Sequence, residues 1–112
     1  MKKKTLQLTF NHYLMSFESD TLTTQYNMDV VINNNTKVAS CVYTIKEPYP
    51  EATITYIQVF EGYRRRGVAT AIVQELERKY GGLAWDYKFT DDGRKWFNAL
   101  IERKIVKNSC FV

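Results

Sequence analysis

A basic turn between a predicted strand and a predicted helix constrains this chain more than any other stretch. Residues 54–60, ITYIQVF, are nearly all β-branched or aromatic, which is typical of a largely buried strand. From Val68 onward the apolar residues recur at helical spacing, with Ile72 and Leu76 on the same face and charged residues opposite. The turn between these segments carries three consecutive arginines followed by Gly67. The pattern therefore predicts a strand, a basic turn and an amphipathic helix.

The start of this predicted helix is a candidate anion-binding site. A helix begins with backbone N–H groups that have no partner inside the helix, and its dipole is positive at this end, so phosphate oxygens bind there. The absence of a side chain at Gly67 lets a phosphate approach the backbone. Arg64, Arg65 and Arg66 add planar charged donors. A diphosphate is the expected ligand, and a solvated basic loop is the alternative that the spacing alone leaves open.

The same turn carries a family resemblance. The run VFEGYRRRGVA at residues 59–69 resembles the acetyl-CoA signature of the GNAT acetyltransferase superfamily, whose core is Gln/Arg-x-x-Gly-x-Gly/Ala. Arg64, Gly67 and Ala69 fill the fixed positions of this core, and the family requires it after a buried strand and at a helix start. The resemblance implies a mixed α+β fold with a twisted, mostly antiparallel GNAT-like sheet, one parallel and splayed pair of strands, and two main helices.

Hydrophobic periodicity and turn residues predict the remaining elements. Strands are expected at 5–10, 22–32 and 37–46 as an antiparallel meander, at 83–87 parallel to 54–60, and at 105–112, with a second helix at 91–103. Residues 12–17 fit either a longer first strand or a short turn of helix. The family usually places two helices between its first two strands, so this chain departs from it there. No linker divides the chain, so we expect one domain, residues 1–112, which under the resemblance binds acyl-CoA.

Charge and composition narrow the class of protein. The 16 basic and 12 acidic residues give a net charge of +4, which suits a polyanion such as coenzyme A and would also suit weak contact with nucleic acid. The lysines at the start precede alternating apolar and polar residues instead of a signal core, and no stretch reaches membrane-spanning length, so a cytoplasmic protein is expected. Cys41 and Cys110 are expected to be reduced thiols, and no cluster has the spacing of metal ligands.

The resemblance also implies how the cofactor binds. Coenzyme A would enter between the strands at 54–60 and 83–87, which a bulge in the first strand splays apart. Backbone groups of Ile57 and Val59 would bind the acetyl and pantetheine portions like an added strand, and the amides of residues 65–70 would bind the pyrophosphate. The cofactor-binding residues implied by the resemblance are Ile57, Val59, Arg64, Arg65, Arg66, Gly67, Val68, Ala69 and Thr70.

The implied reaction is direct transfer of acetyl from acetyl-CoA to an amine of a small molecule or protein, which needs a proton for the departing thiolate. The family often supplies it from a tyrosine in the helix after the parallel strand, but 91–103 contains none. Tyr87, near the end of the preceding strand, is the candidate general acid, and a rim hydroxyl without a role is the simpler interpretation. Many family members use a glutamate as general base, but the matching position in this chain is near Thr53, which cannot serve as a base. Glu51 and Glu61 are close in sequence, and solvation at the surface is the better interpretation for both.

Two other functions remain open from the sequence. A nucleic-acid-binding module would use Tyr56, Phe60 and Tyr63 with the three arginines, although the chain lacks the aromatic RNA-binding signature of the common sheet module and +4 is small for the task. A catalytically degenerate GNAT-like domain would bind coenzyme A or a protein partner without turnover. The missing helix tyrosine and the short first connection keep this alternative open. A homodimer is also compatible with the sequence.

Overall fold

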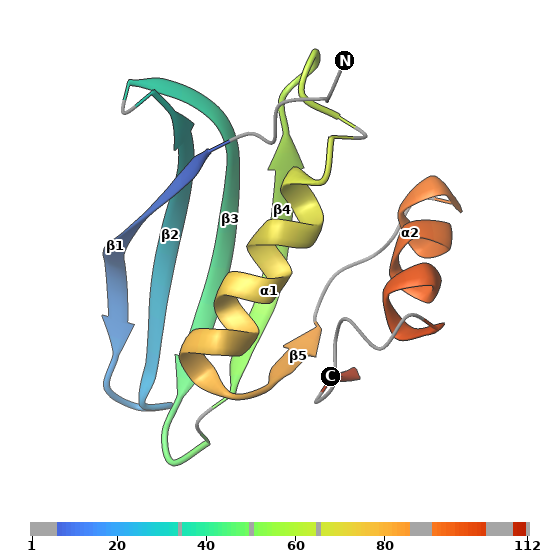
Figure 1. Cartoon of the computed structure of the whole chain (residues 1–112). Helices are drawn as coiled ribbons and strands as arrows, with labels where there is room; N and C mark the ends of the chain where they lie inside the picture. Colours follow the sequence, from blue (N-terminus) through green and yellow to red (C-terminus); the bar gives the residue numbers. More distant parts are fainter. Residues whose placement is uncertain are drawn as a thin grey trace.

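The computed structural model describes residues 7–33, 35–49, 51–64, 66–85, 91–102 and 109–111. The elements in chain order are β1 (Leu8–Glu18), β2 (Thr23–Ile32), β3 (Thr36–Lys46), β4 (Ala52–Val59), α1 (Val68–Tyr80), β5 (Leu83–Trp85), α2 (Asp91–Glu102) and β6 (Ser109–Phe111). All strands belong to one sheet, in which neighbours in space are also neighbours in sequence (Figure 1). The expected mixed α+β fold is thereby confirmed.

The first half of the chain is the predicted antiparallel meander of β1, β2, β3 and β4. The ambiguous segment at 12–17 is strand, because its backbone continues the β1 ladder and pairs with β2. Leu14 pairs with Tyr26 and Ser16 pairs with Gln25, so Met15 is the extra residue of a bulge. A turn at residues 19–22 leads directly into β2. The two helices that the family usually has at this point are absent from this described part of the chain.

The second half consists of parallel crossovers. β5 pairs in parallel with β4, as predicted for a strand–helix–strand connection, and β6 pairs in parallel with β5. α1 begins at Val68 and ends where Gly81 adopts a left-handed conformation with φ 78°, its N–H donating to the Glu77 carbonyl oxygen at 2.7 Å. The predicted start of this helix is confirmed. The ends of the strand expected at 83–87 and of the helix expected at 91–103 lie outside the described residues.

The hydrophobic core lies between the sheet and one layer of helices. α1 lies across β3 and β4 (Figure 1). Trp85 of β5 pairs with Ile54 and therefore shares its face of the sheet, where its ring stacks edge-on against Phe97 of α2 with centroids 4.8 Å apart. α2 thus covers the same face as α1. The largest fully buried side chains are Trp85, Tyr43, Met28, Ile54, Ile72, Leu76 and Leu83.

The opposite face of the sheet is largely polar. Strand alternation places Asn27, Ser40, Thr44 and Gln58 there, and no described helix covers them. Cys41 points instead into the core, where it is a free thiol, and burial raises its pKa to about 12. None of the described helices combines the length and apolar character needed to cross a membrane.

Candidate functional site

β4 contains a bulge at Thr55. Val42 of β3 pairs with Tyr56, whereas Tyr43 pairs with Ile54, which leaves Thr55 as the extra residue. The Thr55 hydroxyl donates to the Val42 carbonyl oxygen at 3.1 Å and holds the bulge against β3. Within the described part of the chain, β5 pairs with β4 along residues 52–54, on the N-terminal side of this bulge. The bulge itself agrees with the expectation from the family resemblance, whereas the residues that would pair with or separate from β4 beyond it lie outside the described part of the chain.

Beyond the bulge, the strand presents backbone groups toward the side away from β3. The Phe60 amide donates to the Val38 carbonyl oxygen of β3 at 2.9 Å. Backbone groups of successive strand residues point to alternate edges, so those of Ile57 and Val59 point away from β3. Both side chains are half-buried and pack against the core. These two backbones are therefore placed to pair with an extended ligand.

The arginine turn is packed against the end of β4. Arg64, which is exposed, donates from Nε to the Val59 carbonyl oxygen at 3.0 Å. Arg66 is also exposed, and its guanidinium lies 6.0 Å from the centre of the Tyr63 ring, a cation–π contact. Tyr63 in turn packs against the core. Arg65 lies outside the described residues. The described guanidinium groups are thus positioned beside the start of α1 by β4 and by Tyr63.

The start of α1 has the donor set of an anion site. Gly67 is the N-cap in the left-handed conformation, with φ 81° and ψ 8°, and no side chain caps the helix. No acidic residue lies in the first turn. A Cβ built on Gly67 would meet no atom within 4 Å, so the space in front of the glycine is open. Val68 buries its side chain, while the amides that follow Gly67 lie at the positive end of the helix. These residues fit a phosphate group.

The first turn of α1 is tied to α2. Trp96 donates from Nε1 to the Thr70 hydroxyl oxygen at 3.0 Å, and the Trp96 ring stacks edge-on against Trp85, with centroids 6.3 Å apart. The family resemblance implies a phosphate-binding role for the Thr70 amide, but no pattern in the sequence indicates this side-chain bond. The two residues lie 26 positions apart, so no local spacing connects them.

The structure describes only some of the candidate catalytic residues. Tyr87 lies outside the described residues. Thr53 is in β4 and pairs with Ala84 of β5. Glu51 precedes β4, and Glu61 is exposed in the turn that follows it. Among the described residues, the geometry therefore gives a candidate binding surface, and it places no proton donor or acceptor beside it.

The aromatic residues of the nucleic-acid alternative do not share one surface. Tyr56 is exposed on the polar face of the sheet, whereas Tyr63 packs against the core on the side of α1. Phe60 has the Lys37 ammonium 6.0 Å from its ring centre. Nucleic-acid strands bind to rows of aromatic rings that face the same way, and these three do not form such a row.

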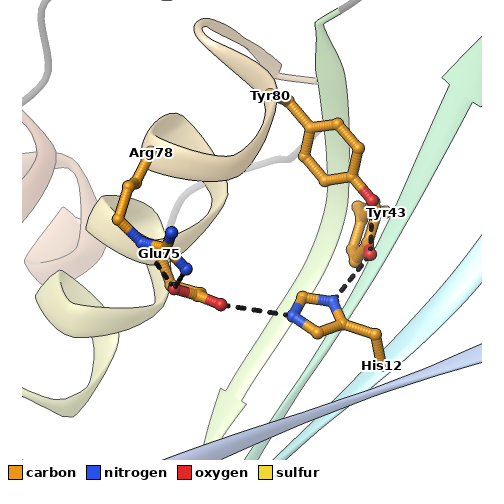
Figure 2. Close-up of polar contacts among 5 residues, drawn as sticks. All are labelled: His12, Tyr43, Glu75, Arg78 and Tyr80. Carbon is orange, nitrogen blue, oxygen red and sulfur yellow. Dashed lines mark hydrogen bonds and ion pairs between the residues drawn. The ribbon is translucent and has the colours of Figure 1, made fainter.

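A second polar cluster joins β1, β3 and α1 (Figure 2). His12 lies with Nε2 3.4 Å from a Glu75 carboxylate oxygen and with Nδ1 2.8 Å from the Tyr43 hydroxyl, which is 2.9 Å from the Tyr80 hydroxyl. A carboxylate can only accept, so Nε2 carries the proton of the neutral ring. Tyr43 then donates to Nδ1 and Tyr80 donates to Tyr43. One consistent set of donors and acceptors satisfies the whole cluster.

Burial governs the protonation of this cluster. Burial, followed by the charge of Lys79, lowers the pKa of His12 and outweighs the opposing effect of Glu75. Burial opposes ionisation of Glu75, but hydrogen bonds from Arg78, at 2.6 Å from Nη2, and from His12 hold the pKa of this carboxyl below its usual value. Burial also raises the pKa of Tyr43. This cluster links the first strand to the helix, in keeping with a structural role for the chain's one histidine.

A comparison with known protein families gives a match over most of the chain. The sequence profile of the acetyltransferase (GNAT) family matches residues 4–102. This range includes the meander, the bulged strand, the arginine turn and both helices. No curated protein and no solved structure matches the chain. The profile covers most of the sequence, and the chain therefore belongs to the acetyltransferase (GNAT) family.

Proposed function

We propose that this protein is an acetyl-CoA-dependent N-acetyltransferase that transfers acetyl to a primary amine of a small molecule or protein by direct attack. Family membership supports acetyltransferase-type function, and the proposal adds the cofactor and the acceptor class. One observation carries it. The Thr55 bulge follows directly after the described pairing of β4 with β5, and the backbone of β4 leads from this bulge to the start of α1, where no side chain caps the helix.

The binding residues follow from this arrangement. The amides after Gly67 receive the pyrophosphate, and Arg64, Arg65 and Arg66 supply charge beside it. The backbones of Ile57 and Val59 pair with the extended pantetheine. Because Arg64 occupies the Val59 carbonyl oxygen, pairing at Val59 requires its guanidinium to exchange that oxygen for a phosphate. The exchange is favourable because hydrogen bonds between charged groups are stronger than those to a neutral carbonyl.

The chemical step draws on the same strand. When bound, acetyl-CoA supplies an acetyl group activated as a thioester. The Ile57 N–H, which points away from β3, can donate to an oxygen that gains negative charge during attack. The acceptor amine must be neutral to attack, and the departing thiolate needs a proton. Tyr87, which follows β5 in the sequence, is the proposed donor of this proton.

Calorimetric titration with acetyl-CoA, beside a single-stranded oligonucleotide, tests the binding function. We expect one acetyl-CoA to bind per chain. We expect the oligonucleotide to show only weak, salt-dependent binding, because the net charge of the chain is only +4. A turnover assay that follows free thiol across a panel of primary amines then tests catalysis. Binding without turnover on any amine would support the degenerate domain. Oligonucleotide binding without acetyl-CoA binding would overturn the proposal.

A further inference from the structure

Among the described strands, β1 forms one edge of the sheet. It is the first strand in the sheet order and pairs with β2 on one side, while no described strand pairs with its other side. The strand is 11 residues long. Proteins usually protect such edges with proline, lysine or a short strand, because unpaired backbone groups are a template for another chain. Residues 8–17 contain no proline, aspartate, glutamate, lysine or arginine.

The same strand exposes a run of large apolar side chains. Leu14 is 66% exposed, Met15 58% and Phe17 55%, and Tyr13 is also exposed. We call these four residues the β1 apolar stretch. A single exposed apolar side chain is ordinary, but four within five consecutive positions form a patch that indicates an interaction site.

The side chains of the β1 apolar stretch lie at the edge of the sheet and are divided between its two faces. Leu14 pairs with Tyr26 and therefore lies on the α1 side of the sheet, whereas Tyr13 pairs with Asn27 and lies on the polar side. The Met15 bulge lies between Tyr13 and Phe17. A partner that covers all four side chains must approach along the edge, in the plane of the sheet. A β-strand is the element that fits this approach, because it also satisfies the backbone groups.

The low charge of β1 bears on which kind of partner the strand can bind. Apart from Glu18 at its C-terminal end, β1 contains no aspartate, glutamate, lysine or arginine, and burial lowers the pKa of His12, so the edge offers little charge to attract a charged segment. Two copies can meet there without repulsion, although each carries a net charge of +4. Antiparallel pairing about a two-fold axis sets the β1 apolar stretch against itself, as the isologous interfaces of dimers do. We propose that this chain forms a homodimer in which the two β1 strands pair antiparallel and continue the sheet from one copy into the other.

The strand is held in position for such pairing. His12 contacts Tyr43 of β3 at 2.8 Å and Glu75 of α1 at 3.4 Å, on the side of the strand that faces the helix. These contacts fix β1 in the monomer, so little ordering is required on association. The start of α1 lies by the C-terminal end of β4, away from the β1 edge, which leaves the anion site outside the interface (Figure 1). The dimer does not depend on acetyl transfer.

Sedimentation velocity of the full chain, from micromolar to submillimolar concentration, tests the dimer. Wild type should sediment as a dimer, and Leu14→Lys and Phe17→Lys should each raise the dimer dissociation constant by at least about tenfold, because a lysine on an edge strand opposes pairing. Tyr49→Lys is the matched control, since Tyr49 is 63% exposed but lies after β3. A monomeric wild type, open-ended assemblies, or lysine variants that dimerise as tightly as Tyr49→Lys would each overturn the proposal.

Cysteine scanning locates the axis independently of these variants. Cysteines at the paired position should oxidise to a linked dimer, because opposed residues of antiparallel strands have Cα atoms roughly 4.5–5.5 Å apart, within disulfide reach. The scan covers residues 13–17, beginning with Met15→Cys. Tyr49→Cys carries the same native Cys41 and Cys110 and controls for their reaction. Absence of a position-specific linked dimer across the scan would reject β1 pairing, even if the protein dimerises by another surface.

Discussion

The Trp96 indole donates to the Thr70 hydroxyl oxygen at 3.0 Å and so joins α2 to the first turn of α1. That turn carries the uncapped amides after Gly67. Backbone donors bind an anion well when they are held in place before it arrives. The bond between Trp96 and Thr70 therefore bears on both the packing of the two helices and the proposed cofactor site.

Trp96→Phe should reduce the free energy of unfolding by about 1 kcal/mol, because it keeps an aromatic ring beside Trp85 but removes a hydrogen-bond donor. Acetyl-CoA affinity should fall a few-fold. Urea unfolding and calorimetry measure the two effects. Combining Trp96→Phe with Thr70→Val forms a double-mutant cycle in which the two changes should be non-additive. Additive losses would show that the hydrogen bond does not contribute in solution.

Gly67→Glu should remove acetyl-CoA binding by placing a carboxylate in the open space before the α1 amides. Gly67→Gln is the control, because it imposes the same strain at φ 81° without the charge. A like charge against the pyrophosphate costs several kcal/mol, so the affinities of the two variants should differ by about a hundredfold or more. Equal affinities, measured calorimetrically with both variants folded, would place the phosphate elsewhere.

Acid should destabilise the protein partly through His12. Burial lowers the folded-state pKa of His12 below its ordinary value of 6.5, so the unfolded chain binds more protons as the pH falls through that value. The free energy of unfolding should therefore decrease from pH 7.5 toward pH 5.5, and the His12→Gln variant should show a smaller decrease. Because His12 is the only histidine, the difference between the two pH profiles isolates its titration. Parallel profiles in urea unfolding would contradict the prediction.

Tyr43→Phe should lower the free energy of unfolding by about 1–3 kcal/mol, because it removes a buried hydroxyl that bonds both His12 and Tyr80. Tyr13→Phe is the matched control: the Tyr13 side chain is 49% exposed, and its loss of a hydroxyl should change stability by no more than about 0.5 kcal/mol. Thermal and urea unfolding check both values. Similar effects of the two substitutions would argue against the importance of the cluster.

The sequence predicts those parts of this fold that arise from local pattern. The β-branched run of β4 and the helical spacing after Val68 each determine structure within a few residues, and the sequence predicts both elements. Residues 12–17 were ambiguous, because a short apolar run suits strand or helix until its partner strand is known. The contact between His12 and Glu75 joins residues 63 positions apart, and no local spacing indicates it.

Some features of the candidate site also follow from local sequence, whereas others depend on the folded sheet. The arginines and Gly67 were predicted from the motif, because an anion site at a helix start uses consecutive residues. The position of the β4 bulge at Thr55 depends on its register with β3, which only the folded sheet defines. The bond from Arg64 to the Val59 carbonyl oxygen likewise depends on the path of the turn.

Both described helices lie on the same side of the sheet, and the half-buried Asn27, Ser40 and Thr44 lie on the other side, which no described helix covers. Unfolding a sheet that is covered on one side exposes comparatively little apolar surface to solvent. The heat capacity should therefore rise less on unfolding than in a chain of similar length whose sheet is covered on both sides. The free energy of unfolding should therefore change only gradually as the temperature moves above or below that of maximum stability.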